Sequence, residues 1–164
     1  MRLPTADKAS WYFALVNVSI GLTGFTGPVV TGNSDRLINI RPGKLFGVFA
    51  MNWAHALLHL GVGLIGFTPS VRTPAHYMKL NAVLFGTLTA AYLLRFRGRP
   101  GIHLMMGMAV NRPANLVHLA WTALGLLYAC GRPDHESTLP LQNHERTQLA
   151  TPGTWTGCPS MPRR

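Results

Sequence analysis

Charge is scarce in this sequence, and acidic charge most of all. Asp, Glu, Lys and Arg make up 12% of its 164 residues, about half the usual share in a soluble globular domain. The five acidic residues stand at positions 7, 35, 134, 136 and 145, outside the cores of the apolar segments. The sequence therefore excludes an HExxH zinc-protease helix and a Ser-His-Asp triad, and it disfavours a transporter that uses a buried carboxylate.

Cysteine is also rare, and the basic residues do not form a nucleic-acid motif. Cys130 and Cys158 are the two cysteines, too few for a disulfide framework. The formal charge is +10, but the basic residues flank apolar segments, where they contact the headgroups of anionic lipids. We therefore expect a lipid bilayer with anionic headgroups as a partner, and no nucleic acid.

Long uncharged segments dominate the first 131 residues. Residues 9–34, 45–71 and 113–131 carry no Asp, Glu, Lys or Arg, and 80–94 form a fourth such segment. A helix that crosses a bilayer needs roughly 20 apolar residues, whereas a soluble amphipathic helix needs a charged face. The pattern predicts a multi-pass integral membrane protein.

Two parts of the chain repeat each other. Residues 41–66 and 99–125 share ten identical positions when one gap follows the RPG that opens both. The identities include Asn52 with Asn111, His59 with His118, and Gly66 with Gly125. Because an apolar segment precedes each copy, we expect two helical hairpins inserted the same way up, related by a pseudo-twofold axis along the membrane normal.

The expected fold class is an all-α membrane four-helix bundle built from two parallel tandem helical-hairpin repeats. Residues 1–131 form the predicted transmembrane domain, and 132–164 form a polar, Pro-rich C-terminal tail. Each hairpin also carries a short apolar stretch, 45–51 or 102–110, which we expect at the membrane interface as a short helix or re-entrant turn. The predicted spans are about 11–30, 50–69, 76–94 and 113–131.

Polar and small residues recur at helical spacing inside these spans. Small residues let helix backbones approach, and polar side chains hydrogen-bond between helices. We expect these stripes to face one another around the axis, as a structural seam. Its members are Asn17 of the first span, Asn52, Gly63 and Gly66 of the second, and Asn115, Thr122 and Gly125 of the fourth.

Three histidines stand out within the seam, and two readings of them stay open. His59 and His118 occupy the repeated position, whereas the counterpart of His55 is Ala114. The first reading is that they hydrogen-bond helices together. The second is that His59 and His118 bind a haem through both axial positions or each hold a chlorophyll-type pigment, with His55 as a further candidate ligand. His55-x-x-x-His59 has metal-ligand spacing, but no carboxylate accompanies it, and no dedicated metal site is predicted.

The segment around Asn52 resembles a known family. It is similar to a domain-of-unknown-function family of small four-helix prokaryotic membrane proteins, whose hallmark is N-P-x-H-N-L-x-H-L followed by a Gly/Leu run. Asn52, His55, His59 and Leu60 match that hallmark, whereas Trp53 replaces its proline and Ala56 its second asparagine. The resemblance covers roughly residues 9–131 and implies the four-helix architecture, without implying an activity.

We expect an integral membrane protein without catalytic activity, a scaffold or accessory subunit of a larger membrane complex. The alternative is a haem- or chlorophyll-binding membrane module that uses His59 and His118. Docking in the first case would use the bundle surface and the C-terminal tail, whose composition is typical of a segment without its own core.

Overall fold

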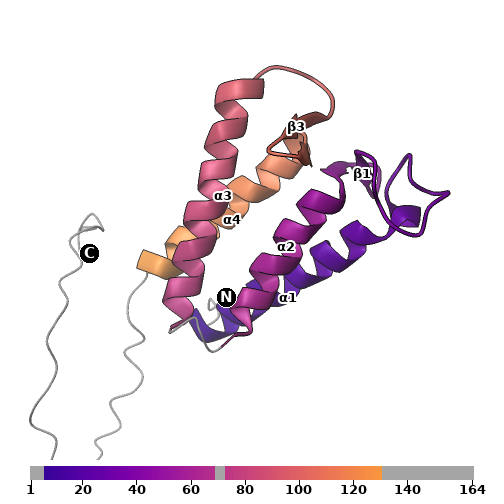
Figure 1. Ribbon diagram of the computed structural model, residues 1–164. Coiled ribbons are helices and arrows are strands. Elements are labelled where there is room, and N and C mark those ends of the chain that lie inside the picture. The colour runs from indigo at the N-terminus through magenta and orange to yellow at the C-terminus, as the bar shows by residue number, and fades with distance from the viewer. Residues whose placement is uncertain (1–5, 69–72, 131–164) are drawn as a thin grey trace, which may run out of the picture.

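The computed structural model describes residues 6–68 and 73–130. Within these ranges it contains four helices and two small β-sheets (Figure 1). The helices are α1 (Ala6–Phe25), α2 (Trp53–Gly66), α3 (Pro74–Phe96) and α4 (Arg112–Cys130). The four predicted helices are thus confirmed. Helix α1 packs chiefly against α2, and α3 chiefly against α4, while the predicted C-terminal tail lies outside the described residues.

The helix ends differ from the predicted spans because of local capping. Helix α2 has 14 residues: the Asn52 side chain accepts a hydrogen bond from the His55 backbone and fixes the start of the helix. Helix α1 ends at Phe25, where Asn39 donates from its backbone to the Phe25 carbonyl and from its side chain to the Gly24 carbonyl. None of the helices in the described ranges has both the length and the mean hydropathy of a membrane-spanning helix.

The two short apolar stretches form β-hairpins, so the prediction of short helices or re-entrant turns there, and of a purely α fold, is wrong. Strand β1 (Gly43–Leu45) pairs antiparallel with β2 (Phe49–Met51), and β3 (His103–Met105) with β4 (Met108–Val110). Each turn contains two successive residues with positive φ, Phe46-Gly47 and Met106-Gly107. That backbone is typical of the type I′ turn, whose twist matches a two-stranded ribbon.

Asn52 joins the first half of the molecule to the hairpin of the second half. Its Nδ2 donates to the carbonyl of Gly107 at 2.8 Å, and its Oδ1 accepts from the backbone N–H of Ala109 at 3.0 Å. The same Oδ1 caps α2 through the His55 N–H. One side chain therefore starts a helix and bonds the opposite hairpin.

Asn111 makes the equivalent contacts in the reverse direction. Its Nδ2 donates to the carbonyl of Val48 at 2.8 Å, and its Oδ1 accepts from the N–H of Ala50 at 3.1 Å. It also caps α4 through the Ala114 N–H. The exchange is reciprocal between repeat-equivalent residues, which explains why both copies carry an asparagine just before the helix.

The interior of the bundle combines an apolar core with buried polar side chains, and many large apolar side chains lie on the exterior. Asn17 and Asn81 are fully buried, and the histidines described below lie between the helices. By contrast, the side chains of Leu94 and Leu116 are 88% and 67% exposed. The apolar part of the core is centred on α3, with Tyr77, Met78 and Phe85 as its largest fully buried members.

Candidate functional site

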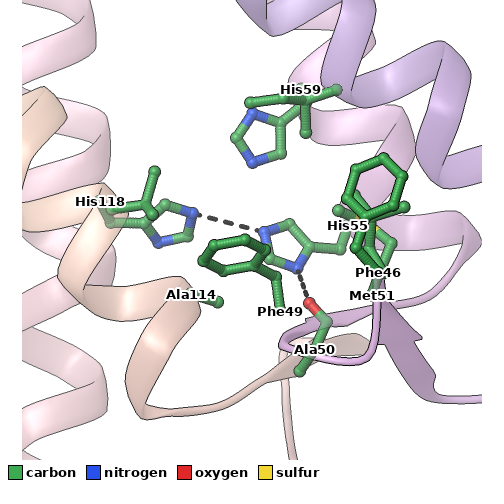
Figure 2. A pocket seen from close by; sticks show the side chains of 11 residues that line it. Phe46, Phe49, Ala50, Met51, His55, His59, Ala114 and His118 are labelled. Atoms are coloured by element: carbon green, nitrogen blue, oxygen red, sulfur yellow. Dashed lines mark hydrogen bonds between the residues drawn. The ribbon is translucent and has the colours of Figure 1, made fainter. Parts of the chain in front are cut away.

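Three histidines from two helices meet in the interior. His55 and His59 stand one turn apart on α2, and His118 reaches them from α4 (Figure 2). The centroids of the imidazole rings are 5.1 Å apart for His55 and His59, 5.3 Å for His55 and His118, and 5.7 Å for His59 and His118. One nitrogen of each ring lies within 4.8 Å of the others, and all three side chains are at most 3% exposed. They form a compact buried cluster, called here the histidine cluster.

The hydrogen bonds of His55 fix which of its nitrogens carries the hydrogen. Its Nδ1 lies 3.1 Å from the carbonyl oxygen of Ala50 and 2.8 Å from that of Ala109. Carbonyl oxygens only accept, so Nδ1 carries the hydrogen and the neutral ring presents the Nε2 lone pair. Ala50 and Ala109 are equivalent in the repeat, so His55 bonds both halves at their meeting point.

This position also explains why only one copy of the repeat carries a histidine here. A single imidazole already occupies the point where the two equivalent carbonyls meet. Ala114, the counterpart of His55, is small and lines the cavity beside the cluster. A second imidazole at that position would compete for the same two carbonyls.

His59 is oriented by α1. Its Nδ1 is 2.8 Å from Oδ1 of Asn17, whose Nδ2 donates to the Phe13 carbonyl. Since Oδ1 is the accepting atom of the amide, His59 donates from Nδ1 and its Nε2 bears a lone pair. Within the described part of the chain, that Nε2 has no hydrogen bond. Trp121 also donates to Asn17 Oδ1, at 3.4 Å.

His118 completes the cluster from the other half. Its Nε2 lies 3.3 Å from Nε2 of His55, and its Nδ1 is buried without a hydrogen-bond partner in the described ranges. The Phe85 ring covers the cluster on one side, with its centroid 4.9 Å from that of His118 and 5.5 Å from that of His59. The three rings together thus have more nitrogen lone pairs than neighbouring donors.

An apolar cavity of about 210 Å³ adjoins the histidine cluster. Phe46, Phe49 and Met51 of the first β-hairpin line it, together with the three imidazoles (Figure 2). The cavity is below the roughly 300–1,000 Å³ of a pocket for a drug-sized ligand. It has room for a small molecule or ion beside the nitrogens.

The geometry does not accommodate the haem predicted between His59 and His118. A macrocycle bound through both axial positions must lie between its two ligand rings, yet the Nε2 of His55 lies only 3.3 Å from that of His118. A pigment held by one histidine needs an open face above the imidazole, whereas all three rings are buried. An ion bound by all three nitrogens requires no such space.

A single metal ion fits the geometry of the histidine cluster better than a haem or a chlorophyll-type pigment does. A tetrahedral site with metal–nitrogen bonds of about 2.0–2.1 Å places its ligand nitrogens about 3.3–3.4 Å apart, and the His55–His118 separation is 3.3 Å. Histidines that ligate metals usually donate their other ring N–H to a carboxylate, a backbone carbonyl or water. His55 donates to backbone carbonyls in this way, and His59 donates to the side-chain oxygen of Asn17. On binding an ion, the nitrogen of His59, which lies within 4.8 Å of those of His55 and His118, would move closer to both.

The other predicted seam residues lie mainly inside each hairpin rather than around the axis. A Cβ on Gly63 would lie 2.6 Å from the backbone nitrogen of Val18 in α1, and one on Gly125 would lie 2.9 Å from the Met78 carbonyl oxygen in α3. Gly66 likewise faces Ala14 of α1, along with Tyr77 of α3. These glycines set the close approach of α1 to α2 and of α3 to α4.

The two remaining seam residues bond within α4. Thr122 donates to the His118 carbonyl and faces Gly86 of α3, and Asn115 donates to the Asn111 carbonyl. The seam prediction missed Asn111 itself, although the repeat aligns it with Asn52. It also missed the contact between His55 and His118, because only the folded chain brings these two residues together.

Comparison with known proteins gives a family and no activity. The family model of a domain of unknown function (DUF4383) matches residues 8–131, which include the histidine cluster and both asparagines. No curated protein and no solved structure matches the chain.

Proposed function

Since this chain belongs to the DUF4383 family, whose description names no activity, we propose from its site that it is a non-catalytic integral membrane protein that binds a transition-metal ion. The ion is held between the two halves of the bundle by His55, His59 and His118. The observation that carries the proposal is the convergence of three buried imidazole nitrogens within 4.8 Å of one another.

Membrane insertion is supported by the distribution of polar and apolar side chains. Several asparagines and three histidines are buried between the helices, while leucines on α2, α3 and α4 are among the most exposed side chains. Water favours the opposite arrangement, whereas lipid favours polar contacts between helices and apolar side chains outside. The apolar exterior also offers the surface through which an accessory subunit would dock in a larger complex.

The ligand set selects the class of metal. Imidazole nitrogens suit zinc, copper, iron and nickel, whereas calcium and magnesium prefer oxygen ligands. Three neutral imidazoles leave the charge of the ion uncompensated beside an apolar cavity. The cost of burying an ion rises with its charge, which favours Cu(I) over Zn(II). The thioether of Met51, which lines the same cavity, is a soft group of the kind that favours Cu(I).

The test is metal binding by the full chain purified in a neutral detergent. Cu(I) and Zn(II) are supplied separately under anaerobic conditions, and bound metal per chain is measured by mass spectrometry after gel filtration. We expect about one ion per chain for the wild type. His118→Ala should lose it, whereas His76→Ala should not, because His76 is exposed and only bonds Thr73 at the start of α3.

Two results would overturn the proposal. Metal-free wild-type protein after loading with either ion would remove the metal site, as would equal metal content in wild type and His118→Ala. Complete release of the expressed chain from membranes by alkaline carbonate would separately remove the proposed membrane location. Without a metal site, the histidine cluster would be a hydrogen-bonded part of the core.

A further inference from the structure

A second cavity, which shares no lining residue with the one beside the histidine cluster, is lined by basic side chains. Its volume is about 600 Å³, and most of its lining residues belong to the end of α3, the segment that follows α3 and the start of α4. Four cationic residues line it from three separate segments: Lys44 of β1, Arg97 and Arg99 after α3, and Arg112 at the start of α4. We call these four residues and their cavity the basic pocket.

No acidic side chain neutralises the basic pocket within the described ranges. The described segments hold two acidic residues: Asp7 lies in the first turn of α1, and Asp35 lies 3.9 Å from Arg36. Neither lines the pocket. Four like charges around one cavity repel one another, so an anion that enters it relieves the repulsion and gains from each cation.

The backbone of this loop holds the arginines around the cavity. Gly98 and Gly101, which flank Arg99 and Pro100, have φ values of 78° and 97°, a region that favours glycine. On the opposite wall, the capping bonds of Asn111 fix the start of α4 and hence the position of Arg112. The pocket is thus built from ordered backbone on two sides.

We propose that the basic pocket binds a phosphate-bearing anion. Guanidinium groups match the geometry of phosphate oxygens and can bind them in a bidentate manner. The pocket is larger than a phosphate ion requires and contains Tyr92 and Leu93 of α3 beside its cations. This combination of charge and apolar wall fits an anionic phospholipid headgroup whose chains follow the exposed face of α3. That source of the phosphate rests on the proposed membrane location, whereas the anion site itself does not.

The test compares three probes on the full chain in neutral detergent, by isothermal titration calorimetry. The probes are dioctanoyl phosphatidylglycerol, dioctanoyl phosphatidylcholine and inorganic phosphate. We expect phosphatidylglycerol to bind at least tenfold more tightly than phosphatidylcholine, and binding to weaken as salt rises. The double variant Arg97→Gln/Arg99→Gln should weaken phosphatidylglycerol binding by about tenfold or more. The matched control, Arg41→Gln, removes an exposed cation outside the pocket and should leave binding unchanged.

The outcomes separate the two sources of the anion. Tight binding of phosphatidylglycerol with weak binding of inorganic phosphate supports a lipid headgroup site. Comparable binding of inorganic phosphate, lost in the double variant, supports a site for free phosphate and removes the lipid. Equal binding by wild type and double variant, or no binding of either anion, overturns the proposal. Circular dichroism checks that the double variant folds, and Arg97→Lys/Arg99→Lys, which keeps the charge, should retain part of the binding.

Discussion

At the scale of single residues, one buried amide, Asn17, determines how His59 presents its nitrogens. Asn17 of α1 accepts a hydrogen bond from His59 Nδ1 and so directs the Nε2 lone pair toward the cluster. Asn81 of α3 is equally buried, but it bonds the carbonyl of Tyr77 in its own helix. The two asparagines therefore offer a matched pair of substitutions, one coupled to the histidine cluster and one not.

Asn17→Leu should weaken metal binding without removing a ligand. The substitution deletes the acceptor that orients His59, and loss of such a partner typically costs 10–100-fold in metal affinity. Asn81→Leu should leave the affinity within about threefold of wild type. Both affinities are measured by competition with a chromogenic chelator in detergent. Equal affinities for the two variants would contradict an orienting role for Asn17.

Asn111 illustrates how one side chain can stabilise several contacts at once. Asn111→Ala removes the cap of α4 and leaves the backbone N–H of Ala50 and the carbonyl of Val48 without their partner. Loss of a cap costs about 1 kcal/mol, and an unsatisfied buried donor costs about 1–3 kcal/mol. We therefore expect the free energy of unfolding to fall by about 2–4 kcal/mol, measured by denaturant titration in detergent.

The control for that variant is Asn115→Ala, one turn further along α4. Asn115 is also buried, but it donates a single bond to the Asn111 carbonyl and its Oδ1 has no partner in the described ranges. Its removal should cost about 0.5–1.5 kcal/mol, the net contribution of one hydrogen bond. A loss as large as that of Asn111→Ala would show that burial alone, and not the contact between halves, governs stability.

At the scale of the elements, glycine determines how closely the paired helices approach. Gly63 faces α1, where an added Cβ would lie 2.6 Å from the Val18 backbone nitrogen. Gly61 stands two residues earlier on the same helix, and a Cβ there would meet nothing within 4 Å. The same substitution at these two positions should therefore have opposite effects.

Gly63→Ala should destabilise the protein and Gly61→Ala should stabilise it. A backbone clash forces the helices apart, and overpacking typically costs about 1–3 kcal/mol. At Gly61, the gain is the helix propensity of alanine over glycine, up to about 1 kcal/mol. Thermal unfolding followed by circular dichroism compares the two variants with wild type. A stabilised Gly63→Ala would mean that α1 and α2 are not in backbone contact.

The sequence predicted the elements better than the contacts between them. Uncharged segments of helical length were sufficient to locate four helices. The β-hairpins were missed because their strands have three residues each and Phe46 and Met106 adopt positive φ, a conformation uncommon for bulky residues. The sequence named His59, His118 and His55 as candidate cofactor ligands, but it did not predict that one nitrogen of each ring converges on a common centre, because the distance between residues of α2 and α4 depends on how the folded chain packs.

At the scale of the whole molecule, the two halves are related through equivalent residues. Asn52 and Asn111 exchange hydrogen bonds with the opposite hairpins, and the carbonyls of Ala50 and Ala109 converge on one nitrogen of His55. If the halves are interchangeable at this point, a histidine supplied from α4 in place of Ala114 should bond the same two carbonyls and direct its Nε2 to the same centre.

The final prediction exchanges the residues at two repeat-equivalent positions, 55 and 114. His55→Ala should reduce metal affinity by more than the 10–100-fold that orienting residues cost, because a ligand is lost. The double variant His55→Ala/Ala114→His should recover affinity to within about tenfold of wild type, since the two changes act on one shared position and are not additive. Competition with a chelator measures both variants. A double variant that binds no better than His55→Ala would mean that only α2 can present this ligand, and that the halves share a sequence pattern without sharing the centre between them.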